Sequence, residues 1–137
     1  MDEMLKQAVL EAWQRIPEEC RSPPATEQEL IAFEAEFGSI PSEFRWYLAE
    51  CGGGPAGTEW IDPITELTET HRRFLEERRA GFWANMTDVF VVGHDGGGNP
   101  YGIHRASGKL LVEDHDFGGV HELASTFADY LRQGLRL

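Results

Sequence analysis

Two short segments of the chain combine imidazole with carboxylate groups, the side chains often used for proton transfer and for binding divalent metal ions. His94 and Asp95 form the first, and the sequence Glu-Asp-His-Asp at 113–116 forms the second. Neither segment has a known ligand spacing, such as two histidines one helical turn apart. In a strand, the two aspartates of the second segment would also point away from its histidine. The sequence therefore predicts no catalytic residue, no metal site and no cofactor, and a small metal-dependent hydrolase remains a third alternative to the binding functions considered below.

A run of glycines, 96–98, follows the first of these segments. Phosphate-binding loops of the Walker type need a Lys followed by Ser or Thr at a helix start, and dinucleotide-binding loops also lead into helices. Here Asn99 and Pro100 follow the glycines and lead into an extended segment. We interpret the run as a tight reversal with positive φ. His71 and His104 lie within periodic apolar patterns, which is typical of packed or half-exposed structural histidines.

The net charge points to the class of partner. Twelve Lys and Arg stand against twenty-four Asp and Glu, which gives a formal charge of −12. A field of this sign repels phosphate backbones and anionic membrane surfaces, and it speeds the encounter with a basic protein. The excess of acids also serves solubility alone, which is the alternative interpretation. We expect a basic protein partner, no nucleic acid and no membrane binding.

The acids gather in two places. No Lys or Arg lies between Arg45 and Arg72, whereas five acids and Trp60 do. A second group lies at 113–116 on the predicted hairpin, and Asp95 precedes the glycine run. Acids around an exposed aromatic side chain would suit a basic partner, with the aromatic ring as its anchor; a buried Trp60 in the core is the alternative. The predicted partner-binding residues are Glu59, Trp60, Asp62, Glu66, Asp95, Glu113, Asp114 and Asp116.

Helices are predicted wherever apolar residues recur three to four positions apart. The helices expected by this rule span 5–16, 26–37, 41–51, 64–79 and 126–135. Thr26 and Glu29 match a capping box, in which a hydroxyl and a carboxylate satisfy free backbone N–H groups at a helix start. Pro17 ends the first helix, and three prolines in 17–25 indicate an exposed connection. Cys20 and Cys51 fit no metal or redox spacing, and Cys51 follows an apolar stripe, so we expect it to be buried.

Strands are expected at 58–61, 88–92, 101–104 and 109–113, where β-branched and aromatic residues replace the helical period. The last two are joined by a short polar connection that ends in Gly108, as in antiparallel hairpins. The pattern predicts one α+β domain over 1–137, with an antiparallel meander sheet of about four strands packed by about five helices. We expect residues 1–25 to form an N-terminal helix and connection, and 26–137 to form the core.

Four pieces occur in an order that resembles a known family. They are the capped helix 26–38 with Glu34 in its middle, the Ile-Pro-Ser-Glu-Phe start at 40–44 running to Gly52–Gly54, the strand and glycine loop 91–100, and the terminal segment 123–131. Together they resemble the SMI1/KNR4 family of the SUKH superfamily. The resemblance implies a compact α+β fold in which Glu34, Pro41, Gly53 and Gly98 are structural. It also implies a binding role, as immunity proteins against polymorphic toxins in bacteria or as signalling scaffolds in fungi.

The leading functional hypothesis is an immunity-type protein that neutralises a cognate, basic, nuclease-like toxin by direct contact and without a cofactor. The alternative is an intracellular scaffold or regulatory domain of the SMI1/KNR4 type. The sequence begins with acids and has neither a basic leader followed by an apolar run nor a stretch long enough to span a bilayer, so we expect a cytoplasmic protein. We expect a monomer or a weak dimer.

Overall fold

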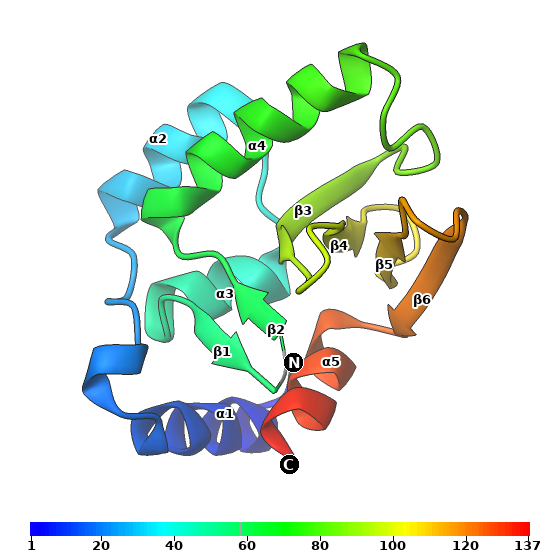
Figure 1. The fold of residues 1–137 in the computed structure, drawn as a ribbon. Coiled ribbons are helices and arrows are strands. Elements are labelled where there is room, and N and C mark those ends of the chain that lie inside the picture. Colours follow the sequence, from blue (N-terminus) through cyan, green and yellow to red (C-terminus); the bar gives the residue numbers. More distant parts are fainter. Residues whose placement is uncertain (58) are drawn as a thin grey trace.

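A computed structural model describes residues 1–57 and 59–137 (Figure 1). The first half of the described chain contains α1 (Glu3–Arg15), the 3-10 turn η1 (Glu18–Cys20), α2 (Glu27–Phe37), α3 (Ser42–Glu50), β1 (Gly54–Ala56), β2 (Glu59–Ile61) and α4 (Ile64–Arg79). The second half contains β3 (Val89–His94), β4 (Pro100–His104), β5 (Leu110–Glu113), β6 (Val120–Ala124) and α5 (Phe127–Leu135). The chain is therefore an α+β domain, as the sequence predicts.

Side-chain caps fix the helix starts. The Thr26 hydroxyl accepts a hydrogen bond from the Glu29 N–H at 3.1 Å, and the Glu29 carboxylate accepts one from the Thr26 N–H at 3.0 Å, so the capping box is confirmed. Thr126 caps α5 by accepting from the Asp129 N–H at 3.0 Å. Gly38 ends α2 with φ of +89°, a region that favours glycine. Local chemistry thus sets these boundaries to within one or two residues of their expected positions.

The main sheet is an antiparallel meander in the order β3-β4-β5-β6. Its fourth strand differs from the sequence prediction. The segment expected at 58–61 pairs instead with β1 in a separate two-stranded sheet, and Thr58 lies outside the described residues. The fourth strand of the meander is β6, which pairs with β5 from Glu113 opposite Val120 onwards. Gly118 and Gly119 form part of the reversal between these two strands.

The main core lies between one face of this sheet and helices α2, α3 and α5. The ring of Phe44 packs edge-on against Phe90 of β3 and Phe127 of α5, at centroid distances of 5.8 and 5.4 Å. Leu5 and Val9 of α1 are buried in the same cluster. The opposite face of the sheet, at Val91, meets a smaller cluster of Phe74, Trp83 and Met86.

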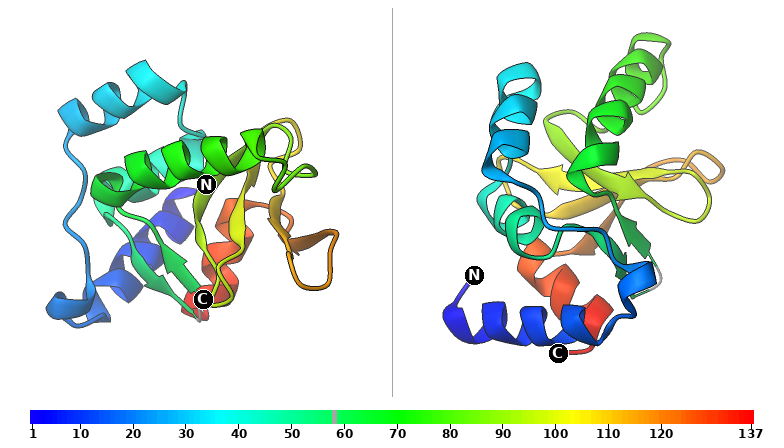
Figure 2. Two further views of the ribbon diagram at one scale, coloured as in Figure 1. Left: turned by 45° about the horizontal axis from the view of Figure 1, so that its top comes forward. Right: turned by 90° about the vertical axis from the view of Figure 1, so that its left-hand side faces the viewer.

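The helices divide between two ends of the molecule. Helices α2 and α4 pack side by side at one end, and α1 packs against α5 at the other (Figures 1 and 2). The segment that joins α4 to β3, residues 81–88, and the turn between β5 and β6, residues 114–119, lie beside the sheet away from α1 (Figure 1). The predicted acidic residues are positioned by β2, the start of α4, the loop between β3 and β4, and the end of β5 with the turn that follows it.

Candidate partner-binding surface

Trp60 lies at the surface. Its side chain is 41% exposed, so it is not the core residue that the alternative interpretation expected. Its backbone carbonyl accepts a hydrogen bond from the Tyr101 hydroxyl at 2.5 Å, which fixes β2 against the sheet. Glu66 is exposed in the first turn of α4, and Glu59 is half-buried beside Trp60. This part of the predicted surface therefore contains an exposed Trp60 and an exposed Glu66, with Glu59 half-buried.

Asp62, by contrast, lies in the interior. Its carboxylate accepts a hydrogen bond from the Thr70 hydroxyl at 2.6 Å, and its N–H donates to the Val92 carbonyl at 2.9 Å. Burial raises the pKa of Asp62. These contacts tie the β2–α4 junction to β3, so Asp62 has a structural position and is removed from the candidate surface.

Glu113 is also buried. Its carboxylate accepts a hydrogen bond from the Asn85 N–H at 2.8 Å, which joins the end of β5 to the 81–88 segment. A buried carboxylate needs hydrogen-bond partners, and the Asn85 N–H provides one for Glu113. Because that partner lies 28 positions away in the chain, the sequence pattern did not reveal it. Glu113 is the second residue removed from the surface.

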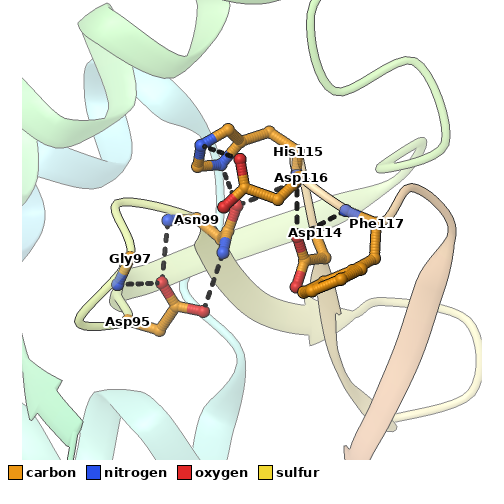
Figure 3. A network of polar contacts seen from close by, with 7 residues as sticks. All are labelled: Asp95, Gly97, Asn99, Asp114, His115, Asp116 and Phe117. Carbon is orange, nitrogen blue, oxygen red and sulfur yellow. Dashed lines mark hydrogen bonds and ion pairs between the residues drawn. The ribbon is translucent and has the colours of Figure 1, made fainter.

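Asp95 closes the glycine loop between β3 and β4 (Figure 3). One carboxylate oxygen accepts from the N–H groups of Gly97 and Asn99, both at 2.9 Å, and the other accepts from the Asn99 side-chain amide at 3.0 Å. Gly98 has φ of +82°, which fits the tight reversal expected from the glycine run. The Asp95 carboxylate therefore stabilises the loop, and Asp95 is only half-exposed.

Asn99 joins this loop to the β5–β6 turn and is the residue that sequence reasoning missed. Its side chain is buried, and its carbonyl oxygen accepts from the His115 N–H at 2.9 Å and also contacts the His115 ring (Figure 3). An asparagine between a glycine run and a proline was the only local signal. The two loops that carry Asp95 and the 114–116 acids are therefore connected through one buried amide.

The turn itself is built on Asp114, whose carboxylate accepts from the N–H groups of Asp116 and Phe117 at 2.8 and 3.1 Å. These two hydrogen bonds lower the pKa of Asp114. The Asp116 carboxylate lies 3.2 Å from the His115 ring, so the expectation that these side chains point apart is wrong. β5 has already ended at Glu113, and the alternation of a strand does not extend into a turn.

The residues expected to be structural make specific contacts. Glu34 accepts from the Ile40 N–H and from the Arg45 guanidinium, each at 3.0 Å, and the hydrogen bond from Ile40 is the main cause of its lowered pKa. Pro41 immediately precedes α3, and its carbonyl accepts from the Arg45 N–H. Gly53 has φ of +128°, and a Cβ there would lie 2.9 Å from the Ile61 carbonyl oxygen. The contacts of Glu34 join α2 to α3. The absence of a side chain at Gly53 allows the backbone just before β1 to lie close to β2.

The model of the SMI1/KNR4 family (SUKH-1) matches residues 24–133, which include every element from α2 to β6 and most of α5. The chain belongs to the SMI1/KNR4 family. The match leaves α1 and η1 outside. No curated protein matches the chain. Membership in the SMI1/KNR4 family identifies an immunity-like or SMI1-type domain that binds protein partners.

The histidines of this SMI1/KNR4 domain make mainly structural contacts. His71 donates from Nε2 to the Val91 carbonyl at 2.8 Å, and burial lowers its pKa to about 4. Burial also lowers the pKa of His94. His104 contacts the Ser107 hydroxyl within the β4–β5 connection at 2.8 Å. Over residues 1–57 and 59–137, no three His, Cys, Asp or Glu side chains are grouped as ligands for a metal ion, and none of the described helices has the length and apolar character to cross a bilayer.

Proposed function

We propose that this protein is an immunity-type SMI1/KNR4 domain that acts in the cytoplasm and neutralises a basic, nuclease-like toxin by direct contact. One observation carries the proposal: a domain of this family presents acids on segments held by its own hydrogen bonds. Asp116 and Glu66 are exposed, and Asp114 is partly exposed and fixed by the turn it closes. The proposed surface comprises Glu59, Trp60, Glu66, Asp95, Asp114 and Asp116.

The charge argument supports the nuclease class. A nuclease must bind a phosphate backbone, so its substrate groove carries Lys and Arg, and an acidic protein can occupy that groove in place of nucleic acid. The net charge of −12 accelerates this encounter at long range, and the exposed acids act at contact. Side chains fixed before binding lose little conformational entropy, which favours tight binding.

The immunity function predicts a toxin gene next to this one, and the test uses the toxin domain which that gene encodes. Co-expression of the intact chain should restore growth to cells that produce this domain, and the purified pair should bind with one-to-one stoichiometry. The association rate constant should fall at least about tenfold between low salt and physiological ionic strength. An association rate that does not depend on salt would refute the electrostatic mechanism, and failure to restore growth would refute the immunity function.

Charge-removing variants test the surface itself. Glu66→Gln and Asp116→Asn remove exposed acids from the proposed surface, whereas Glu11→Gln removes an exposed acid from α1 at the opposite end. The first two should each slow association at low salt, and the third should leave it unchanged. Equal effects of all three would mean that only the overall charge matters, and the proposed surface would then be wrong.

The alternative, an SMI1-type regulatory scaffold, predicts a different result. A scaffold gene would have no toxin gene beside it across genomes, and the protein would bind the same cellular partner whether or not a toxin is present. Gene neighbourhood therefore separates the two functions before any protein is purified.

A further inference from the structure

Two phenylalanines are exposed on the loops beside the acidic turn. The side chain of Phe117 in the β5–β6 turn is 89% exposed, and that of Phe82 in the 81–88 segment is 58% exposed. Trp83 follows Phe82 in the chain, and its ring contacts that of His115, which lies two positions before Phe117. The ring centroids of Phe82 and Trp83 are 6.4 Å apart, and those of Trp83 and His115 are 6.1 Å apart. We call these four residues the aromatic tip.

The inner residue of this tip is tightly held. Trp83 is buried against Phe74, Met86 and Val91, and its indole N–H donates to the Glu77 carboxylate at 2.7 Å. Its backbone has φ of +57°, an uncommon value for a bulky residue, which persists only where the surrounding contacts enforce it. The buried Glu113 carboxylate holds the same segment at the Asn85 N–H. Phe82 is thus exposed on a segment whose position is fixed by the buried Trp83 and by the hydrogen bond to Glu113.

The β5–β6 turn, which carries Phe117, is equally constrained. Asp114 accepts from the Phe117 N–H at 3.1 Å, and Asn99 accepts from the His115 N–H at 2.9 Å, so the backbone on both sides of Asp116 is held. The Phe117 ring nevertheless extends into solvent. A large apolar side chain that is exposed on a fixed backbone costs little entropy when a partner covers it, and aromatic residues of this kind are frequent binding hot spots.

The charges around the tip indicate the chemistry of its occupant. Asp114 and Asp116 precede Phe117 in the turn, and His115 is the basic side chain between them. Arg78 and Arg79 lie in the last turn of α4 before Phe82, with the Arg78 guanidinium over the Phe74 ring. The acids therefore surround Phe117, whereas the arginines lie on the Phe82 side. A partner that covers Phe117 has to present Lys or Arg side chains around an apolar pocket.

We propose that Phe117, supported by Phe82, is the apolar anchor with which this protein docks into a pocket on its basic toxin partner. The neighbouring aspartates then pair with cations at the rim of that pocket. This inference rests on the function proposed above. It assigns the main contact with the toxin to two phenylalanines, whereas the surface predicted from the sequence consists of acids and Trp60.

Side-chain truncation provides the test, with the toxin domain of the neighbouring gene as the probe. Phe117→Ala should raise Kd at least about thirtyfold, mainly through faster dissociation, and Phe82→Ala should raise it several-fold. Met4→Ala on α1 and Ile31→Ala on α2 remove other exposed apolar side chains and should change Kd less than about twofold. Thermal unfolding of each variant checks that the fold is retained, as expected for surface truncations.

The outcomes separate this inference from the proposed function. If the unaltered protein binds and neutralises the toxin and Phe117→Ala does so equally well, the anchor is wrong and the immunity function stands. If the unaltered protein does not bind the toxin, both are refuted. Sedimentation at several concentrations tests whether a second copy of the chain, and not the toxin, binds Phe117. Self-association that Phe117→Ala abolishes, with toxin affinity unchanged, would overturn the inference in favour of a dimer.

Discussion

The buried His71 makes the stability of the fold depend on pH. His71 lies on α4 with 8% of its surface exposed, packs against the rings of Phe90 and Phe33 at 4.5 and 5.1 Å, and donates to the Val91 carbonyl. Burial disfavours the charged ring and lowers its pKa from 6.5 to about 4. The folded protein therefore keeps this histidine neutral in a pH range where the unfolded chain protonates it.

The sign and size of the effect follow from this difference in protonation. Between pH 6.5 and about 4 the unfolded chain binds one more proton at this position, so the free energy of unfolding decreases as the pH falls. With the pKa of His71 at about 4 in the folded state, lowering the pH from 7 to 5 should cost about 2 kcal/mol of stability from this residue alone. Above the unfolded pKa of about 6.5, His71 is neutral in both states, so this loss of stability is essentially absent there.

Urea unfolding at pH 7 and pH 5 measures the effect, and His71→Gln serves as the comparison because glutamine retains an N–H donor but does not titrate. His94 has a lowered pKa and contributes in the same direction, but it is present in both proteins. The loss of stability on acidification should therefore be about 2 kcal/mol smaller in His71→Gln. Equal losses in the two proteins would refute the assignment of a buried, neutral His71.

Three further predictions concern the contacts that hold the loops and helices together. Gly53→Ala should lower the free energy of unfolding by about 2 kcal/mol or more, because its Cβ would meet backbone atoms at 2.9 Å; Gly118→Ala also has positive φ but meets nothing within 4 Å, so urea unfolding should show the smaller loss there. Glu34→Ala leaves the Ile40 N–H without its acceptor and Arg45 with Glu27 alone, and it should cost about 1–3 kcal/mol in the same assay. In the folded protein a thiol reagent should label the exposed Cys20 but not the buried Cys51, whose pKa burial raises to about 12, and rapid labelling of both would contradict the model.

The sequence predicted those elements whose determinants are local. The Thr26–Glu29 capping box and the three-to-four spacing of apolar residues fix the helices, because a helix satisfies its own backbone groups. The strand β6 was missed because it has no strong alternating pattern and depends on pairing with β5. The three-residue strand β1, which contains Pro55, was missed for the same reason.

The candidate surface was predictable only in part, because burial depends on residues distant in sequence. An aspartate and a glutamate in acid-rich segments were expected to be exposed, yet Asp62 hydrogen-bonds Val92 and Glu113 hydrogen-bonds Asn85, both far away in the sequence. The role of Asn99 likewise depends on His115, sixteen positions later. Charge and composition predicted the class of partner, whereas the distinction between an acid that supports a loop and an acid that faces solvent required the three-dimensional arrangement.

The contact between α1 and α5 affects when the protein can reach its native state during synthesis. Leu5 and Val9 emerge from the ribosome before α5, against which α1 packs and which follows only after most of the domain has been translated. At elongation rates of about 5–20 residues per second, the apolar side of α1 stays uncovered for several seconds. The nascent chain is therefore a natural substrate for chaperones that shield early apolar segments, and the sheet can form well before the first helix docks.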